Sequence, residues 1–250
     1  MEEGWRRVRA NRGAFGVDGQ SLAEVEAYGV ERILVQLSEV LRAGGYRPAP
    51  SRRRVISKPD GGRRPLGVPT VRDRIVQTAA KIVVEPIFEA DFSESSFGYR
   101  RSATDALEVS RTYFPKGYVW VAEFDITDFF SSIDHDRLMG PIEKRISDRR
   151  VLKLVRLWLK AGVLAEGRLT ETVAGTPQGG VISPLLASIF LNELGFRLHV
   201  RFDGSGLVLG EGGSGRVGGA GCCESGIRVG GLERSHGDRC VSPLWDGAPA

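Results

Sequence analysis

The stretch EFDITDFFSSID, residues 123–134, decides the fold, because it joins an apolar strand to a group of carboxylates. The apolar residues just before it predict a buried strand over 118–126. Asp125 and Asp128 stand around the end of that strand, with two phenylalanines directly behind them. A buried carboxylate is costly unless something pairs with it, and a metal ion is one such partner.

Asp125 has two interpretations on these residues alone. In the first, it caps the turn that follows a buried strand. In the second, it is a metal ligand in a phosphoryl-transfer site, since Mg²⁺ usually takes one or two carboxylates together with substrate phosphates. A strand end aims a carboxylate rigidly, as such a site requires. Both interpretations remain open at this point.

The composition indicates a soluble globular protein with a mild preference for polyanions. The 250 residues are enough for one large domain or two small ones, and the net charge is +4. No apolar run approaches the roughly 20 residues that span a bilayer, and the first residues lack the apolar segment of a secretory signal. We therefore expect a cytoplasmic protein with no membrane contact. The three cysteines show neither a disulfide framework nor a zinc spacing.

A basic β-hairpin is predicted over residues 51–69, because two short segments flank the turn signal Asp60-Gly61-Gly62. It carries six basic residues: Arg52, Arg53, Arg54, Lys58, Arg63 and Arg64. These charged residues either form a solvated surface or bind phosphate. Lys58 and Arg64 flank the tight turn, where both could reach one triphosphate.

A glycine-rich loop, Gly175-Thr-Pro-Gln-Gly-Gly180, precedes a helix that should begin at Ser183-Pro184. The loop is either a connector or a backbone that approaches a flat ligand closely, as glycine permits. In the second case Gln178 would project its amide into the site.

Helical periodicity predicts the other helices. One covers about 21–43 and is broken near Gly29; another begins at Val71 and stops near Pro86; a third covers about 151–159. Ser102 with Asp105 is a possible cap for a further helix. After about residue 200 the periodicity fades, and 14 of the last 50 residues are glycine, out of 33 in the chain. That tail is expected to be disordered, or never selected for this fold.

Taken in order, these stretches resemble a bacterial group II intron-type reverse transcriptase, the RNA-directed DNA polymerase of intron maturases. The resemblance covers about residues 5–200. The matching stretches are NRGAFGVDG (11–19), YRPAP (46–50), KPDGGRRPLGVP (58–69), DRIVQ (73–77), EPIF (85–88), SFGYR (96–100), FDITDFF (124–130) and GTPQGGVISPLL (175–186).

The resemblance implies an α+β fold with the fingers and part of the palm of a right-hand polymerase, the palm being an antiparallel sheet with packed helices. The implied organisation is a helical extension (1–45), fingers (46–118), first part of the palm (119–148), fingers and palm helices (149–174), nucleotide-pocket loop and palm helix (175–200) and an atypical Gly-rich tail (201–250).

The resemblance also assigns roles in catalysis. Asp125 matches the first metal-binding aspartate, and the Ile126 carbonyl should help to hold the same Mg²⁺. Two Mg²⁺ ions about 3.5–4 Å apart would clamp the in-line displacement in which a primer 3′-hydroxyl attacks a deoxynucleoside triphosphate. Asp128 matches no metal ligand of the family and is left as a turn residue.

The remaining implied roles concern the nucleotide and the partners. Lys58 and Arg64 match residues that hold the incoming triphosphate. Phe130 matches the aromatic residue that packs under the sugar and discriminates against a 2′-hydroxyl, and Gln178 matches the glutamine that lines the nucleotide pocket. The implied partners are an RNA template (intron RNA) and a DNA primer, both recognised through backbone and shape rather than base identity. The sequence identifies no protein partner.

The chain departs from the family after the helix that begins near Pro184. The family has a Tyr-Ala-Asp-Asp hairpin there, whereas this sequence has no Asp-Asp pair and only a lone Asp203 in that region. We expect a truncated or frame-shifted reading of the gene that is inactive alone, with the Asp125 strand left without a sheet neighbour. The alternative function is a non-catalytic intron-RNA-binding, maturase-like fragment.

Overall fold

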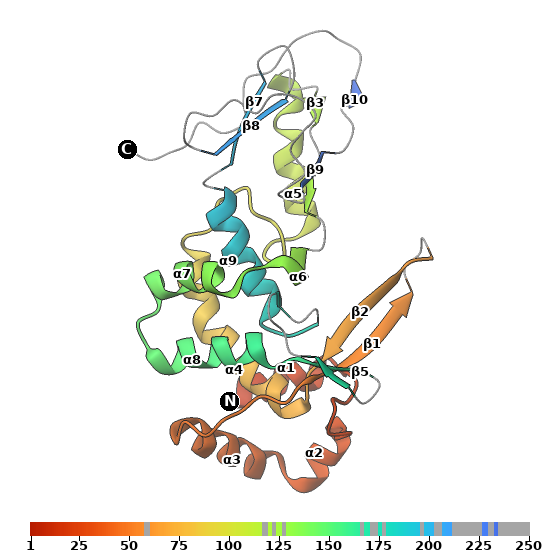
Figure 1. Cartoon of the computed structure of the whole chain (residues 1–250), viewed down its shortest axis with the longest axis vertical. Helices are drawn as coiled ribbons and strands as arrows, with labels where there is room; N and C mark the ends of the chain where they lie inside the picture. The colour runs from red at the N-terminus through yellow and green to blue at the C-terminus, as the bar shows by residue number, and fades with distance from the viewer. Residues whose placement is uncertain are drawn as a thin grey trace. The chain divides into compact units, whose positions relative to one another are not determined.

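The chain folds as a mixture of helices and small sheets, and the α+β class is confirmed (Figure 1). The computed structural model describes residues 1–57, 61–116, 120–121, 124–126, 129–165, 168–170, 175–176, 179–195, 198–202, 207–211, 227–229 and 233–234. They fall into two compact units. The first unit comprises Met1–Phe92 with Phe130–Phe190, and the second comprises Ser93–Phe129 with Leu191–Ala250.

The first unit begins with three helices: α1 (Glu2–Ala10), α2 (Leu22–Tyr28) and α3 (Val30–Arg42). A capping box starts α2, in which the backbone N–H of Glu24 donates to Ser21 Oγ over 3.3 Å and that of Ser21 donates to Glu24 Oε2 over 2.7 Å. Gly29 separates α2 from α3 with a φ of +107°, which favours glycine. The predicted break is therefore confirmed.

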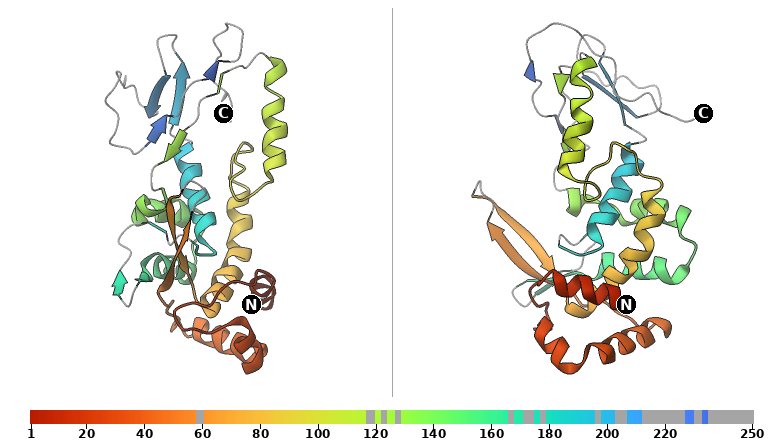
Figure 2. Two further views of the ribbon diagram at one scale, coloured as in Figure 1. Left: turned by 90° about the vertical axis from the view of Figure 1, so that its right-hand side faces the viewer. Right: turned by 180° about the vertical axis from the view of Figure 1, so that it is seen from behind.

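The predicted basic hairpin is also confirmed. Strands β1 (Ser51–Ser57) and β2 (Arg63–Val68) pair antiparallel. The sequence did not predict that the hairpin belongs to a larger sheet with the strand order β2-β1-β5-β6. Strand β5 (Val163–Ala165) lies parallel to β1, and β6 (Arg168–Thr170) lies antiparallel to β5. In Figures 1 and 2 the hairpin projects away from the helices of its unit.

Helix α4 (Val71–Glu89) forms the centre of the first unit. The prediction that it stops near Pro86 is wrong, because a proline in the last turn removes only one hydrogen bond, that to the Ile82 carbonyl, and the helix ends three residues later. Helix α1 packs closely on α4: a Cβ on Gly4 would lie 2.9 Å from the Ile75 carbonyl oxygen.

Four further helices complete the first unit, and three of them contribute to its core. They are α6 (Phe129–Ser132), α7 (His135–Arg145), α8 (Arg149–Lys160) and α9 (Ser183–Gly195), the last continuing into the second unit. Their buried apolar side chains include Leu138, Met139, Ile142, Val155, Trp158, Leu159, Leu185, Leu186 and Ile189.

The second unit contains α5 (Ala103–Arg111), the 3-10 turn η1 (Phe114–Lys116) and short strands. The predicted Ser102–Asp105 cap is present as a capping box at the start of α5. Strand β3 (Trp120–Val121) pairs with β10 (Glu233–Arg234), and β7 (Leu198–Phe202) pairs with β8 (Leu207–Glu211).

The strand that carries Asp125, β4 (Phe124–Ile126), pairs antiparallel with β9 (Ile227–Val229), and Asp125 stands opposite Arg228. The expectation that this strand has no sheet neighbour is therefore wrong. The tail supplies the partner, since Ile227 and Val229 are β-branched residues that suit a strand. Much of the remaining tail lies outside the described residues. Within the part of the chain that is described, no helix has the length and apolarity needed to cross a bilayer.

Candidate nucleotide-binding site

A buried polar network fixes the approach to the basic hairpin. The Tyr46 hydroxyl donates to Asp73 Oδ1 over 2.6 Å, while the Thr70 hydroxyl and the Ala49 backbone N–H donate to Asp73 Oδ2 over 2.7 and 3.1 Å. Trp158 Nε1 in turn donates to the Tyr46 hydroxyl over 3.2 Å. The segment that leads into β1 is thus tied to the first turn of α4 and to α8.

Burial controls the titration of this network. Loss of hydration raises the pKa of Asp73, against the hydrogen bonds from Tyr46, Thr70 and Ala49, which act to lower it. Burial and then the neighbouring Asp73 charge raise the pKa of Tyr46 well above its ordinary value. Both shifts follow from placing an acid where water is largely excluded.

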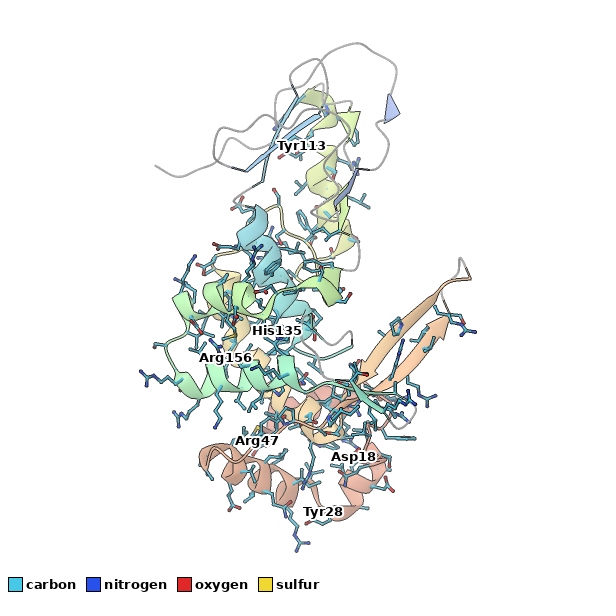
Figure 3. The ribbon with its side chains drawn as sticks, in the orientation of Figure 1. Asp18, Tyr28, Arg47, Tyr113, His135 and Arg156 are labelled. Atoms are coloured by element: carbon cyan, nitrogen blue, oxygen red, sulfur yellow. The ribbon has the colours of Figure 1, made fainter. Side chains whose placement is uncertain are left out.

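The glycine-rich loop begins with a turn bound to the segment that carries Phe130. The backbone N–H of Gly175 donates to the Ile133 carbonyl and that of Thr176 to the Phe130 carbonyl, each over 2.7 Å. His135 Nε2 lies 2.7 Å from the Gly175 carbonyl oxygen (Figure 3 labels His135). Gly175 has a φ of +89°, and a Cβ there would lie 2.5 Å from the Phe130 carbonyl oxygen.

The far end of the loop rests on the hairpin and on α4. Gly179 has a φ of +102°, and a Cβ at this position would approach the carbonyl oxygen of Gly67 in β2 to 2.5 Å. The backbone N–H of Val181 donates to Gln77 Oε1 of α4 over 3.0 Å. Only glycine fits this crossing, so the loop joins the Phe130 segment to the base of the hairpin.

The N-terminal motif NRGAFGVDG packs against the same elements. The guanidinium of Arg52 in β1 stacks over the Phe15 ring, 4.0 Å from its centroid. Arg74 of α4, only 8% exposed, donates from Nη2 to the Ala14 carbonyl over 2.7 Å, and burial lowers its pKa. Nε of both arginines is buried without a hydrogen-bond partner among the described residues.

Three of the predicted nucleotide-binding residues are incompletely described. Lys58 and Gln178 lie outside the described residues, and only the backbone of Arg64 is described, in β2 opposite Ile56. Phe130 is fully described and half-buried in α6. Within the first unit, the structure therefore brings together the Phe130 segment, the described ends of the glycine-rich loop and the base of the hairpin.

The predicted metal ligands belong to the second unit. Asp125 is described in its backbone, in the middle of β4, and Ile126 ends that strand half-buried. Asp128 and Asp203 lie outside the described residues. A carboxylate and a carbonyl oxygen are hard donors of the kind that Mg²⁺ takes. In the described ranges, no three or more side chains of His, Cys, Asp or Glu gather as a metal site.

Sequence reasoning missed His135, Gln77 and Asp73 as residues that position the site. The sequence does contain a signal for His135, because the chain has only three histidines and this one directly follows the Phe130 segment. Gln77 and Asp73 lie inside the stretch DRIVQ, which resembles the family, but the resemblance assigns no role to either residue.

Comparison with known proteins identifies the family. Residues 56–211 match the family described as reverse transcriptase (RNA-dependent DNA polymerase). The chain is 39% identical over 214 residues to Protein YkfC of Escherichia coli, covering 81% of this chain and 55% of that protein. It is 40% identical over 179 residues to group II intron-encoded protein LtrA of Lactococcus lactis, covering 69% of this chain and 30% of that protein.

The chain belongs to the reverse transcriptase family. It is similar to LtrA and to intron proteins such as nuclear intron maturase 1 of Arabidopsis thaliana (34% identical over 94 residues, 37% of this chain and 13% of that protein), and these similarities support a group II intron-type reverse transcriptase or maturase. The chain spans about half of YkfC and under a third of LtrA.

A solved structure shares the fold. The "Cas6-RT-Cas1--Cas2 complex" aligns with a TM-score of 0.50 and 24% identity, over 84% of this chain and 23% of that chain.

Proposed function

We propose that this chain carries the nucleotide-binding part of a group II intron RNA-directed DNA polymerase, which adds deoxynucleotides to a primer 3′-hydroxyl on an RNA template. The observation that carries the proposal is the glycine-rich loop, whose Thr176 N–H is bonded to the Phe130 carbonyl while its Gly179 rests on Gly67 of the basic hairpin. These are the three elements to which the family resemblance assigns nucleotide-binding residues.

In this proposal the hairpin grips the triphosphate and the loop shapes the pocket. Arg64 offers a planar fork of donors and Lys58 a compact point charge, which together suit a polyphosphate. Phe130 packs under the sugar, where an added 2′-hydroxyl would collide with its ring. Gln178 lines the same pocket from the loop.

The proposed ion is Mg²⁺, held by the Asp125 carboxylate and the Ile126 carbonyl. When bound, it supplies charge neutralisation for the transferred phosphoryl group. A second ion needs further carboxylates, because two divalent ions about 4 Å apart repel by roughly 4 kcal/mol even in water. The sequence has no Asp-Asp pair to offset that repulsion. We therefore propose that the chain by itself binds a nucleotide without extending a primer.

The test combines triphosphate binding with primer extension on an RNA template in Mg²⁺. The proposal expects saturable binding of a deoxynucleoside triphosphate, weakened in Asp125→Asn, and no extension by the chain alone. Failure to bind any triphosphate would overturn it. Extension that is lost in Asp125→Asn would instead show that one carboxylate motif is sufficient.

A second candidate is a non-catalytic, maturase-like fragment that only binds intron RNA. The lack of an Asp-Asp pair, together with similarity to an intron maturase, favours this candidate. RNA gel shifts separate the two. Binding of RNA that is unchanged in Asp125→Asn, with no triphosphate binding in the wild type, assigns the fragment function.

A further inference from the structure

Helix α8 presents a row of cations beside a groove of about 390 Å³ between α7 and α8. Arg149, Lys153, Arg156 and Lys160 are spaced four, three and four residues apart, which places them on one face of the helix. All four are exposed, while the opposite face is buried in the core of the first unit. We call this feature, with the groove that the four cations line, the α8 groove (Figure 3 labels Arg156).

This row of cations destabilises the helix that carries it. Arg149 and Lys153, like Arg156 and Lys160, are like charges four residues apart, an arrangement that weakens a helix. Arg149 also occupies the first turn, where the helix dipole disfavours cations, and the N-cap residue Asp148 forms its ion pair with Arg150 instead. Because stability alone would select other residues at these positions, the row is better explained by a ligand than by folding.

Few described groups neutralise the row. Arg156 forms an ion pair with Glu143 of α7, and Lys153 Nζ reaches the Gly44 carbonyl oxygen at 3.5 Å. Arg149 and Lys160 form no ion pair with any residue that the structure describes. Glu143 is the only acidic residue among those that line the groove.

The groove also has apolar residues beside its charges. Leu152 and Leu157 line it and are half-buried. Cations with apolar side chains beside them match a polyanion that also has apolar faces. A nucleic-acid strand has both, because its sugars and bases lie beside its phosphates.

We propose that the α8 groove binds the backbone of an RNA strand, with the cations on phosphates and the leucines against sugars or bases. This inference rests on the proposed function, since it takes RNA as the ligand of the chain. Twelve residues of α8 extend about 18 Å, a length along which a nucleic-acid strand presents several phosphates. None of the candidate nucleotide-site residues lines the groove.

The experiment measures the affinity of the full chain for a 20-nucleotide RNA as a function of salt, by fluorescence anisotropy. The test variant is Arg149→Gln/Lys153→Gln/Lys160→Gln. For three lost phosphate contacts, the slope of log K against log[salt] should fall by about 2, since each contact contributes roughly 0.7 on a single strand. A matched control, Arg6→Gln/Arg7→Gln/Arg9→Gln, removes the same charge from α1 and should leave the slope unchanged.

A second variant tests whether removing a negative charge from the groove raises the affinity for RNA. Glu143→Gln removes the acidic residue of the groove and releases Arg156, so RNA affinity should rise severalfold. Circular dichroism confirms that each variant is folded. Equal slopes for the α8 and α1 variants would overturn the proposal, as would a Glu143→Gln variant that binds RNA no better than the wild type.

Two further measurements separate the possible ligands and the two proposals. Binding to vesicles rich in anionic lipid that is lost in the α8 variant, with RNA binding unchanged, would assign the groove to a membrane and overturn RNA. Triphosphate binding should be the same in the α8 variant and the wild type. If no triphosphate binds but the RNA slope changes as expected, the proposed nucleotide site fails while the α8 groove stands.

Discussion

The imidazole Nε2 of His135 lies 2.7 Å from the carbonyl oxygen of Gly175, a residue 40 positions further along the chain. A carbonyl only accepts hydrogen bonds, so Nε2 must be the protonated ring nitrogen. The same glycine donates its N–H to the Ile133 carbonyl over 2.7 Å. The turn that begins the glycine-rich loop is therefore held on both sides by the segment that follows Phe130.

Replacing this histidine should loosen the turn. In His135→Phe the ring remains but the donor is lost, leaving the buried Gly175 carbonyl without that bond. We expect the free energy of unfolding to fall by about 1–3 kcal/mol and triphosphate binding to weaken, as measured by urea titration and by equilibrium binding. His135→Gln, which keeps a donor, should recover part of both losses. Wild-type stability in His135→Phe would show that the contact has no role.

Gly179 should tolerate no side chain. Gly179→Ala adds a Cβ 2.5 Å from the Gly67 carbonyl oxygen at a φ of +102°, so the loop or the hairpin must shift. Triphosphate affinity should drop at least tenfold. The control is Gly140→Ala in α7, where a Cβ meets nothing within 4 Å. That variant should keep wild-type triphosphate binding. Similar binding by both variants would remove the loop from the site.

Asp73 makes stability depend on pH in a defined direction. Burial raises its pKa above 3.8, so the folded state holds the proton more tightly than the unfolded state. Its contribution is complete below pH 3.8 and is lost as pH rises through the folded-state pKa. Thermal melts from pH 3.5 to 7 should show wild-type stability falling relative to Asp73→Asn as pH increases. A wild type that gains on the variant over this range would mean that the pKa is lowered.

Phe130 should control the choice of sugar. In Phe130→Ala the preference for deoxynucleoside over ribonucleoside triphosphates should shrink at least tenfold in competition binding, because the ring no longer excludes a 2′-hydroxyl. Phe129→Ala, which changes the neighbouring residue of α6, is the matched control and should keep the preference. Equal selectivity in all three proteins would disprove this role.

Local features of the fold could be predicted because turn and cap residues act on their near neighbours. The hairpin follows from Asp60-Gly61-Gly62, and the break between α2 and α3 follows from Gly29. The predicted end of α4 is wrong because the effect of Pro86 depends on its position in the last turn of the helix. Periodicity in the sequence does not reveal that position. The pairing of β4 with β9 joins segments about a hundred residues apart and left no local pattern.

In the candidate site, too, local features could be predicted and contacts between distant parts of the chain could not. The sequence singled out Phe130 and the glycine-rich loop, and the structure joins them through the Thr176–Phe130 hydrogen bond. The sequence did not single out the residues that hold these elements in place. Trp158 donates a hydrogen bond to Tyr46, 112 positions away in the chain, and His135 lies within hydrogen-bond distance of Gly175, 40 positions away. Such bonds depend on the packing of helices, so no spacing rule within the sequence finds them.

The most direct test of the account is the dissociation constant of a Mg²⁺–deoxynucleoside triphosphate for the wild type and for Lys58→Ala/Arg64→Ala, by isothermal titration calorimetry. If Lys58 and Arg64 hold the triphosphate, the double variant binds at least a hundredfold more weakly, while Arg53→Ala/Arg63→Ala, which removes equal charge from the same hairpin, changes binding by less than threefold. Equal weakening by the two pairs, or no effect of either, would contradict the claim that this hairpin holds a triphosphate.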